Sequence, residues 1–111
     1  MSIKNPISIR LKEARLIANI SQKKLGILAG MDEFSASARM NQYEKGKHIP
    51  DFLTLKRIAK VLSVSVSYFY AEDNMLAELL FLYEKSNKES RKQILQFSKD
   101  LYSKQTNNEF V

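Results

Sequence analysis

Apolar residues recur along most of the chain at intervals of three and four, which is the spacing of one face of an α-helix. The first such run follows Asn5-Pro6, a pair typical of a helix start because Asn accepts an amide hydrogen bond and Pro lacks a donor that would be unpaired there. Strand-like alternation is confined to residues 64–67, which are too few for a β-strand. The pattern therefore predicts an all-α protein. The apolar stripe expected for the first helix is Ile7, Leu11, Ala14 and Ala18.

Four more helices are expected before residue 71. One lies between Ser21 and Gly30, one runs from about Ala36 to Lys45 and ends at Gly46, one follows the cap Asp51, and a short one follows Ser65 through Tyr70. The side chains expected to face the core are Leu25, Leu28 and Ala29, then Met40 and Tyr43, then Phe52, Leu55, Ile58, Ala59 and Leu62.

Beyond Ala71 the composition changes. Asp73 or Asn74 is expected to open a helix, and Ser86 and Glu89 have the spacing of a capping box that opens a last helix to about Lys104. The apolar positions of these two helices are Met75, Leu76, Leu79, Leu80 and Leu82, then Ile94, Leu95, Phe97, Leu101 and Tyr102. We therefore divide the chain into residues 1–71, a C-terminal helical segment of residues 72–104 and a flexible tail of residues 105–111.

The net charge of +6 is unevenly distributed. Residues 1–63 carry 12 Lys and Arg against 5 Asp and Glu, a balance of +7, whereas residues 64–111 carry 6 against 7, a balance of −1. A basic half joined to a nearly neutral half indicates that the first half binds a polyanion. Charge alone leaves open whether that polyanion is DNA, RNA or a lipid surface.

Several function classes have little support in the sequence. The absence of cysteine excludes disulfides, thiolate zinc sites and cysteine nucleophiles, and the single histidine, His48, offers little for a histidine relay or a metal site. No glycine-rich phosphate-binding loop is present. We therefore expect no enzyme activity, no metal and no cofactor. The first residues, MSIKNPIS, lack the apolar core of a signal peptide, so we expect a cytoplasmic protein with no membrane partner.

Residues 22–46 contain two short helices joined by a turn, and Gly30 stops the first of them. They form a helix-turn-helix if the two helices can approach closely. Gly26 lies inside the first of these helices, where glycine costs about 1 kcal/mol relative to alanine. Such a glycine is tolerated where another backbone packs in the space of a side chain. We therefore expect the following helix to cross the first one at Gly26.

Residues 7–70 resemble the helix-turn-helix domain of the phage-repressor and Cro type, also called the XRE type. The resemblance is carried by Ser-Gln-x-x-Leu-small-x-x-Ala-Gly at residues 21–30, by Glu-x-Gly at residues 44–46 and by the Pro-led helix of residues 50–62. It implies a five-helix, lambda-repressor-like domain that binds double-stranded DNA, followed here by one or two further helices. It also implies a transcriptional regulator, most simply a repressor, that binds a palindromic operator as a homodimer.

One departure from the family pattern is an insertion of about four residues, around Asp32 to Ser35. We expect it to lengthen the turn rather than the recognition helix, because Ser35 and Ser37 are both good helix caps. The carboxylates of Asp32 and Glu33 should point away from the DNA, since phosphates would repel them.

The helix of residues 36–45 is the expected recognition helix. Arg can bind guanine through two hydrogen bonds in the major groove, and Asn or Gln can bind adenine in the same way. The residues expected to read bases are Ser37, Ala38, Arg39, Asn41 and Gln42. By resemblance, Gln22 would bind a phosphate at the start of its helix, and the other expected phosphate contacts are Lys23, Lys45 and Lys47. The resemblance further implies an ion pair between Arg15 and Glu44 that positions the recognition helix.

The role of the C-terminal helices is open. A single domain of this type covers one half-site, and two-fold dimers join half-sites roughly 34 Å apart. The apolar runs of residues 75–82 and 94–102 could form that dimer interface, pack back on the fourth and fifth helices, or bind another protein. The last possibility corresponds to an antitoxin-like module, because some antitoxins resemble this domain.

Overall fold

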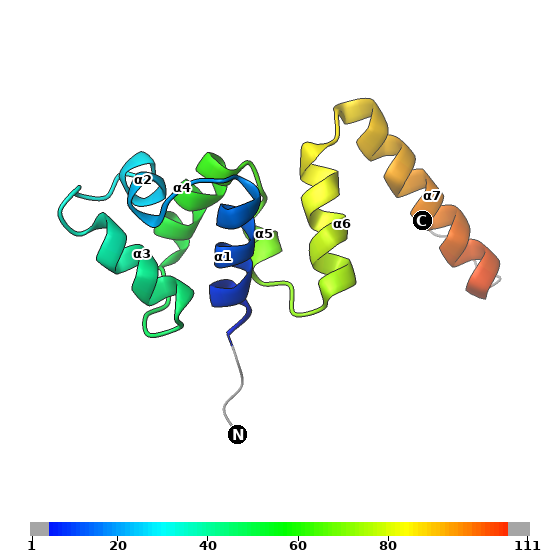
Figure 1. Ribbon diagram of the computed structural model, residues 1–111. Helices are drawn as coiled ribbons and strands as arrows, with labels where there is room; N and C mark the ends of the chain where they lie inside the picture. The colour runs from blue at the N-terminus through cyan, green and yellow to red at the C-terminus, as the bar shows by residue number, and fades with distance from the viewer. Residues whose placement is uncertain (1–4, 107–111) are drawn as a thin grey trace, which may run out of the picture.

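The computed structural model describes residues 5–106, and all regular secondary structure in that part of the chain is α-helical (Figure 1). The helices are α1 (Pro6–Ile17), α2 (Gln22–Leu28), α3 (Ala36–Glu44), α4 (Phe52–Leu62), α5 (Val66–Phe69), α6 (Asn74–Lys85) and α7 (Lys88–Thr106). The predicted all-α fold, with five helices followed by two more, is confirmed.

Most helix starts are determined by side chains that accept a backbone amide hydrogen bond. The capping residues are Asn5, Ser21, Asp51 and Asp73, with donor–acceptor distances of 2.8 to 3.1 Å. Gly30 and Gly46 follow α2 and α3 with φ angles of 94° and 74°, a left-handed conformation that ends a helix. Ser65 makes no capping hydrogen bond, because its hydroxyl group pairs with that of Ser67 at 2.7 Å.

The hydrophobic core lies among α1 to α5. Its fully buried large side chains are Leu11, Leu25, Met40, Leu55, Ile58 and Phe69. The closest helix pair is α2 and α3, and α1 packs against both α3 and α5. This arrangement holds α3 at one side of the unit, with one face against the core and the other exposed.

Three residues predicted to face the core are exposed instead: Ala18, Leu28 and Phe52. Each lies at or just beyond a helix end, where the chain leaves the packed face, and the exposed fractions of Leu28 and Phe52 are 55% and 57%. Met31, which follows the glycine at the end of α2, is buried and belongs to the core.

The start of α7 also differs from the prediction. Asn87 caps this helix by accepting the amide hydrogen bond of Ser90 at 2.8 Å. The hydroxyl group of Ser86 instead donates to the carbonyl oxygen of Leu82 at 2.7 Å, so the expected capping box does not form. Helix α7 continues to Thr106, so residues 105 and 106 of the predicted flexible tail are helical, and residues 107–111 lie outside the described residues.

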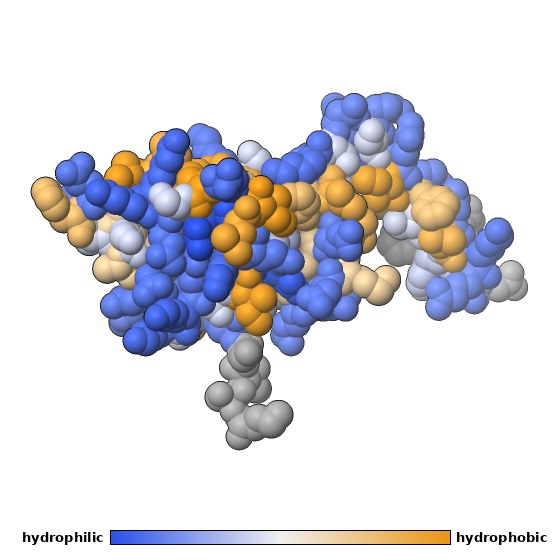
Figure 2. Space-filling model, in the orientation of Figure 1, coloured by the Kyte–Doolittle hydropathy of each residue, from blue (hydrophilic) through white to orange (hydrophobic). Residues whose placement is uncertain are grey.

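The two C-terminal helices differ in how they pack. Helix α6 lies against α5 and buries Ala77, with Leu80 and Phe81 half-buried beside it. Helix α7 buries no residue, and its apolar side chains Leu95, Phe97, Leu101 and Tyr102 are 45% to 65% exposed. Figure 2 shows apolar side chains gathered over α6 and again on α7. The C-terminal segment therefore packs back on the first five helices through α6 alone.

Candidate nucleic-acid interface

The contact between α2 and α3 depends on Gly26. A Cβ atom built on Gly26 would lie 2.8 Å from the Cβ atom of Ala36 and 3.2 Å from its Cα atom. Real Cβ atoms do not approach other atoms so closely, so only glycine permits this crossing. The expected crossing of the two helices at Gly26 is confirmed, and it makes the helix-turn-helix a tightly packed unit.

The insertion forms a turn before α3. The carboxylate of Asp32 accepts the amide hydrogen bond of Phe34 at 3.0 Å, and its carbonyl oxygen accepts those of Ser35 and Ala36 at 3.1 and 2.9 Å. Helix α3 begins only at Ala36, so the extra residues lengthen the turn, as expected. Neither expected serine cap forms, because the Ser35 hydroxyl donates back to the Asp32 carbonyl and Ser37 lies within the helix.

Glu44 connects the C-terminal end of α3 to two other helices. Its carboxylate pairs with both Nε and Nη2 of Arg15 on α1, the second at 3.1 Å, and accepts a hydrogen bond from Gln22 on α2 at 3.1 Å. The side chains of Arg15 and Glu44 are only 12% and 3% exposed. Arg15 also donates to the carbonyl oxygen of Ile20 at 2.9 Å. A buried ion pair between α1 and α3 thus fixes the last turn of α3.

The residues expected to read bases share the side of α3 that faces away from the core. Ser37, Ala38 and Arg39 are exposed, whereas Asn41 and Gln42 are half-buried. Arg39 donates to the hydroxyl group of Tyr43 at 3.2 Å, which extends its guanidinium group along the helix. Mostly polar side chains thus line the exposed face of α3, and the major groove of B-form DNA is wide enough to admit an α-helix.

The residues expected to bind phosphates lie on both sides of this face. Lys23 is exposed near the start of α2, and Lys45 and Lys47 are exposed beyond the end of α3. Gln22 is half-buried, and its amide nitrogen donates to Asn41 at 3.3 Å as well as to Glu44. Gln22, an expected phosphate-binding residue, is therefore hydrogen-bonded directly to Asn41, an expected base-reading residue.

The residues after α3 form one side of a shallow groove that the sequence analysis did not describe. Its lining residues are Arg39, Gln42, Tyr43, His48 and Ile49. Ile49 is well exposed, although it is a large apolar residue. The sequence shows an apolar residue, Ile49, in the polar loop before Pro50, and this was the only local sign of the groove. Its position beside Arg39 and Gln42 depends on the fold.

Two further questions about the described part of the chain concern a metal site and a membrane-spanning helix. Within residues 5–106, no three His, Asp or Glu side chains are grouped so that they could hold a metal ion. None of the helices α1 to α7 is both long and apolar enough to cross a membrane.

The chain is similar to a protein of known structure. No protein-family model matches the chain, and no curated protein matches it. The crystal structure of transcriptional regulator BswR superposes with a TM-score of 0.83 at 46% sequence identity. The match covers 88% of this chain and 97% of that one, so it includes the C-terminal helices as well as the helix-turn-helix.

Proposed function

The chain belongs to the family of the transcriptional regulator BswR, and on that premise we propose that it regulates transcription by binding double-stranded DNA through α3. The observation that carries the proposal is the exposed polar face of α3, which two buried contacts hold in place. One is the packing of Gly26 on Ala36, and the other is the ion pair of Arg15 with Glu44. We assign the DNA-binding unit to the phage-repressor and Cro (XRE) type and expect it to repress by occupying its operator.

In this proposal α3 lies in the major groove and its exposed residues contact base edges. Arg39 is suited to guanine, and Asn41 and Gln42 are suited to adenine, because their donors and acceptors match those bases. Ser37 and Ala38, near the start of α3, have small side chains and would contact only the base edges that lie close to the helix. The buried ion pair at Glu44 matters here because base readout requires the helix to keep one orientation.

The lysines that flank α3 would contact the phosphate backbone on either side of the groove. Lys23 and Gln22 lie near the first turn of α2, where free amide groups favour an anion. Lys45 and Lys47 lie past the other end of α3. Such contacts supply affinity for any sequence and make that affinity fall with salt concentration.

We propose that residues 72–104 join two copies of the chain into a two-fold dimer. Helix α7 and the outer face of α6 present large apolar side chains to solvent, and Met75 and Phe97 are 80% and 65% exposed. Exposed apolar surface of this kind marks an interaction site. A dimer would place two α3 helices on successive major grooves, about 34 Å apart, which suits a palindromic operator.

Binding of the protein to a pool of random duplex DNA tests the DNA-binding proposal. We expect binding that weakens steeply with salt, and a single-stranded RNA pool of equal length should compete poorly. The double variant Arg39→Ala/Gln42→Ala should lose the preference for any enriched sequence while keeping the salt-dependent binding. As a matched control, Lys12→Gln on the exposed side of α1 removes a charge away from α3 and should behave like the parent. Equal binding of the double variant and the parent to enriched DNA would contradict the proposal.

Light scattering tests the dimer. The parent should have twice the mass of one chain, and Phe97→Ser/Leu101→Ser should be monomeric with an unchanged helix content. A parent that stays monomeric with and without DNA would contradict the dimer. The exposed face of α7 would then be better explained by a different protein partner, as in an antitoxin-like module.

A further inference from the structure

Arg10 is a buried arginine in α1 that the expected functions do not use. It is 4% exposed and lies on the same helix face as Ile7, Leu11 and Ala14. Its Nε atom donates to the carbonyl oxygen of Ala71 at 2.8 Å. Its terminal nitrogens donate to the carbonyl oxygen of Glu72 at 3.2 Å, to Oδ1 of Asn74 at 2.9 Å and to the carboxylate of Glu13 at 3.1 Å.

Three of these four acceptors belong to residues 71–74, where the connection after α5 leads into the first residue of α6. Ala71 is buried at the end of the core, and Asn74 is the first residue of α6. The guanidinium group therefore holds both ends of residues 71–74 against α1. Arginine is suited to this role because its donors form a rigid, planar fork, whereas a lysine ammonium is a single flexible group.

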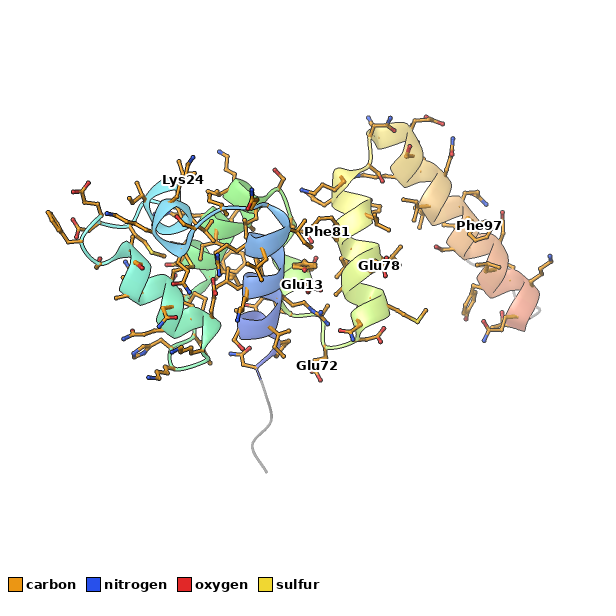
Figure 3. All side chains as sticks on the ribbon, in the orientation of Figure 1. Glu13, Lys24, Glu72, Glu78, Phe81 and Phe97 are labelled. Carbon is orange, nitrogen blue, oxygen red and sulfur yellow. The ribbon has the colours of Figure 1, made fainter. Side chains whose placement is uncertain are left out.

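The carboxylate of Glu13 ties a third helix to the same cluster. It accepts hydrogen bonds from Arg10 and from the hydroxyl group of Tyr68 on α5, the latter at 2.8 Å. Figure 3 shows Glu13 on the side of α1 that faces α6, with Glu72 in the connection between α5 and α6. Helices α1, α5 and the start of α6 thus meet at one hydrogen-bonded cluster.

The far end of α6 is held in a similar way by Arg91 of α7. Its guanidinium group donates to the carbonyl oxygens of Tyr83 and Glu84 at 3.0 and 2.9 Å and lies 4.9 Å from the centre of the Tyr83 ring. The corner between α6 and α7 is therefore fixed at Arg91. The direction of both helices relative to α3 then depends on the packing of α6 against α5, on the hydrogen bond from Lys85 to the carbonyl oxygen of Leu62 at 3.3 Å, and on residues 71–74, where Arg10 acts.

We propose that Arg10 is a positioning residue that sets the distance between the two DNA half-sites by fixing the direction of α6 and α7 relative to α3. This inference rests on the proposed DNA-binding dimer. In such a dimer, the distance between the two α3 helices depends on the direction in which the dimerisation helices leave each DNA-binding unit. Without the Arg10 contacts, the two units keep their half-site affinity but tolerate a wider range of spacings.

A distance measurement without DNA tests the first part. Because the chain has no cysteine, Lys24→Cys on α2 and Gln93→Cys on α7 introduce the only two sites for spin labels. Labelled protein is mixed with excess unlabelled protein, so that distances within one chain are measured. The parent should give one narrow distribution, and Arg10→Lys should widen it about twofold, since ammonium cannot replace the fork. Asn74→Ala removes a single acceptor and should give a smaller widening, and Lys12→Gln should give none.

A spacing series tests the second part. The parent should bind a two-fold operator about tenfold more tightly than the same half-sites moved apart by a few base pairs, because only one geometry allows both units to bind. In Arg10→Lys this ratio should fall to about twofold, with the affinity for a single half-site unchanged. If Arg10→Lys does not fold, the label distances and the spacing ratio are measured on Asn74→Ala instead. Asn74 is exposed, and this substitution removes only one of the acceptors of Arg10.

The outcomes separate this inference from the proposed function. Unchanged label distances and an unchanged spacing ratio in a folded variant would overturn the role of Arg10 and reduce it to a stabilising residue. A parent that binds no duplex DNA would overturn the proposed function and, with it, the spacing role. The label distances would still report whether Arg10 fixes the direction of the C-terminal helices.

Discussion

Gly26 of α2 lies against Ala36 of α3 so closely that an added Cβ atom at position 26 would be 2.8 Å from the Cβ atom of Ala36. This contact sets the distance between the two helices of the helix-turn-helix. Ala36 directly precedes Ser37, the first residue of the exposed face of α3, so any displacement of α3 at Ala36 would move that face.

Gly26→Ala should therefore destabilise the protein. Alanine improves helix propensity by about 1 kcal/mol, but the added methyl group overpacks a closed contact, which typically costs about 1–3 kcal/mol. We expect a net loss of stability in urea unfolding. The double variant Gly26→Ala/Ala36→Gly should recover part of it, because it removes the closest atom. An increase in stability for Gly26→Ala would contradict the tight crossing.

Loss of one member of the Arg15–Glu44 pair should be costly. Removing one partner leaves the other charge buried without compensation, which costs about 3–5 kcal/mol. We therefore expect Arg15→Met and Glu44→Leu each to lower the free energy of unfolding by that amount, and the double variant to lose less than the sum. The Glu84–Arg91 pair, 35% exposed on each side, is the matched control. There, Glu84→Gln should cost less than about 1 kcal/mol.

The helices and the polar face of α3 were predictable because they depend on local features. Capping residues such as Asp51 and left-handed glycines such as Gly46 act within one helical turn, and apolar spacing identifies the buried face. The pattern failed at helix ends, as at Leu28 and Phe52, because periodicity does not reveal where the chain turns away from the core. It also could not choose between Ser86 and Asn87 as a cap, since Ser86 has an alternative acceptor one turn earlier.

Long-range contacts of polar groups were harder to predict. Arg15 and Glu44 are paired as the family resemblance implied, but no local pattern links positions so far apart. Arg10 was not singled out, although an arginine on an apolar helix face at the spacing of Ile7 and Ala14 is an unusual feature. Its partners at residues 71–74 become neighbours only when α5 packs on α1. The apolar positions of α7 could be identified from sequence, but not the fact that Leu95, Phe97 and Leu101 are more than half exposed.

Alkaline pH should destabilise the protein through Tyr68. Burial, and then the hydrogen bond to Glu13, raise the pKa of Tyr68 well above its ordinary value of 10.0. The folded state therefore keeps the phenol neutral while the unfolded state ionises, so the stabilisation is complete below pH 10 and declines as pH rises further. The free energy of unfolding should fall by up to about 1.4 kcal/mol per pH unit above 10 from this group. Tyr68→Phe, measured alongside, should lack that part of the decline, and parallel curves for both proteins would contradict this origin.

Base-reading and phosphate-binding residues should differ in how their loss affects binding. Gln42→Ala or Arg39→Ala should cost about 1–3 kcal/mol on the best operator and relax the preference at one base pair. Lys47→Ala should weaken binding to all sequences alike and reduce the slope of affinity against salt by about one. Titrations of specific and unrelated duplexes at several salt concentrations separate the two effects. If Gln42→Ala lowered the affinity for all sequences equally, Gln42 would instead contact the phosphate backbone of the DNA.

The most direct measurement is the selection of bound duplexes from a random DNA pool by the unmodified protein. We predict a single enriched motif with two-fold symmetry, whose half-sites lie about one helical turn apart, and we predict that Arg39→Ala/Gln42→Ala loses the enrichment. No enrichment by the parent, or the same motif recovered with the double variant, would contradict the claim that the exposed face of α3 reads DNA.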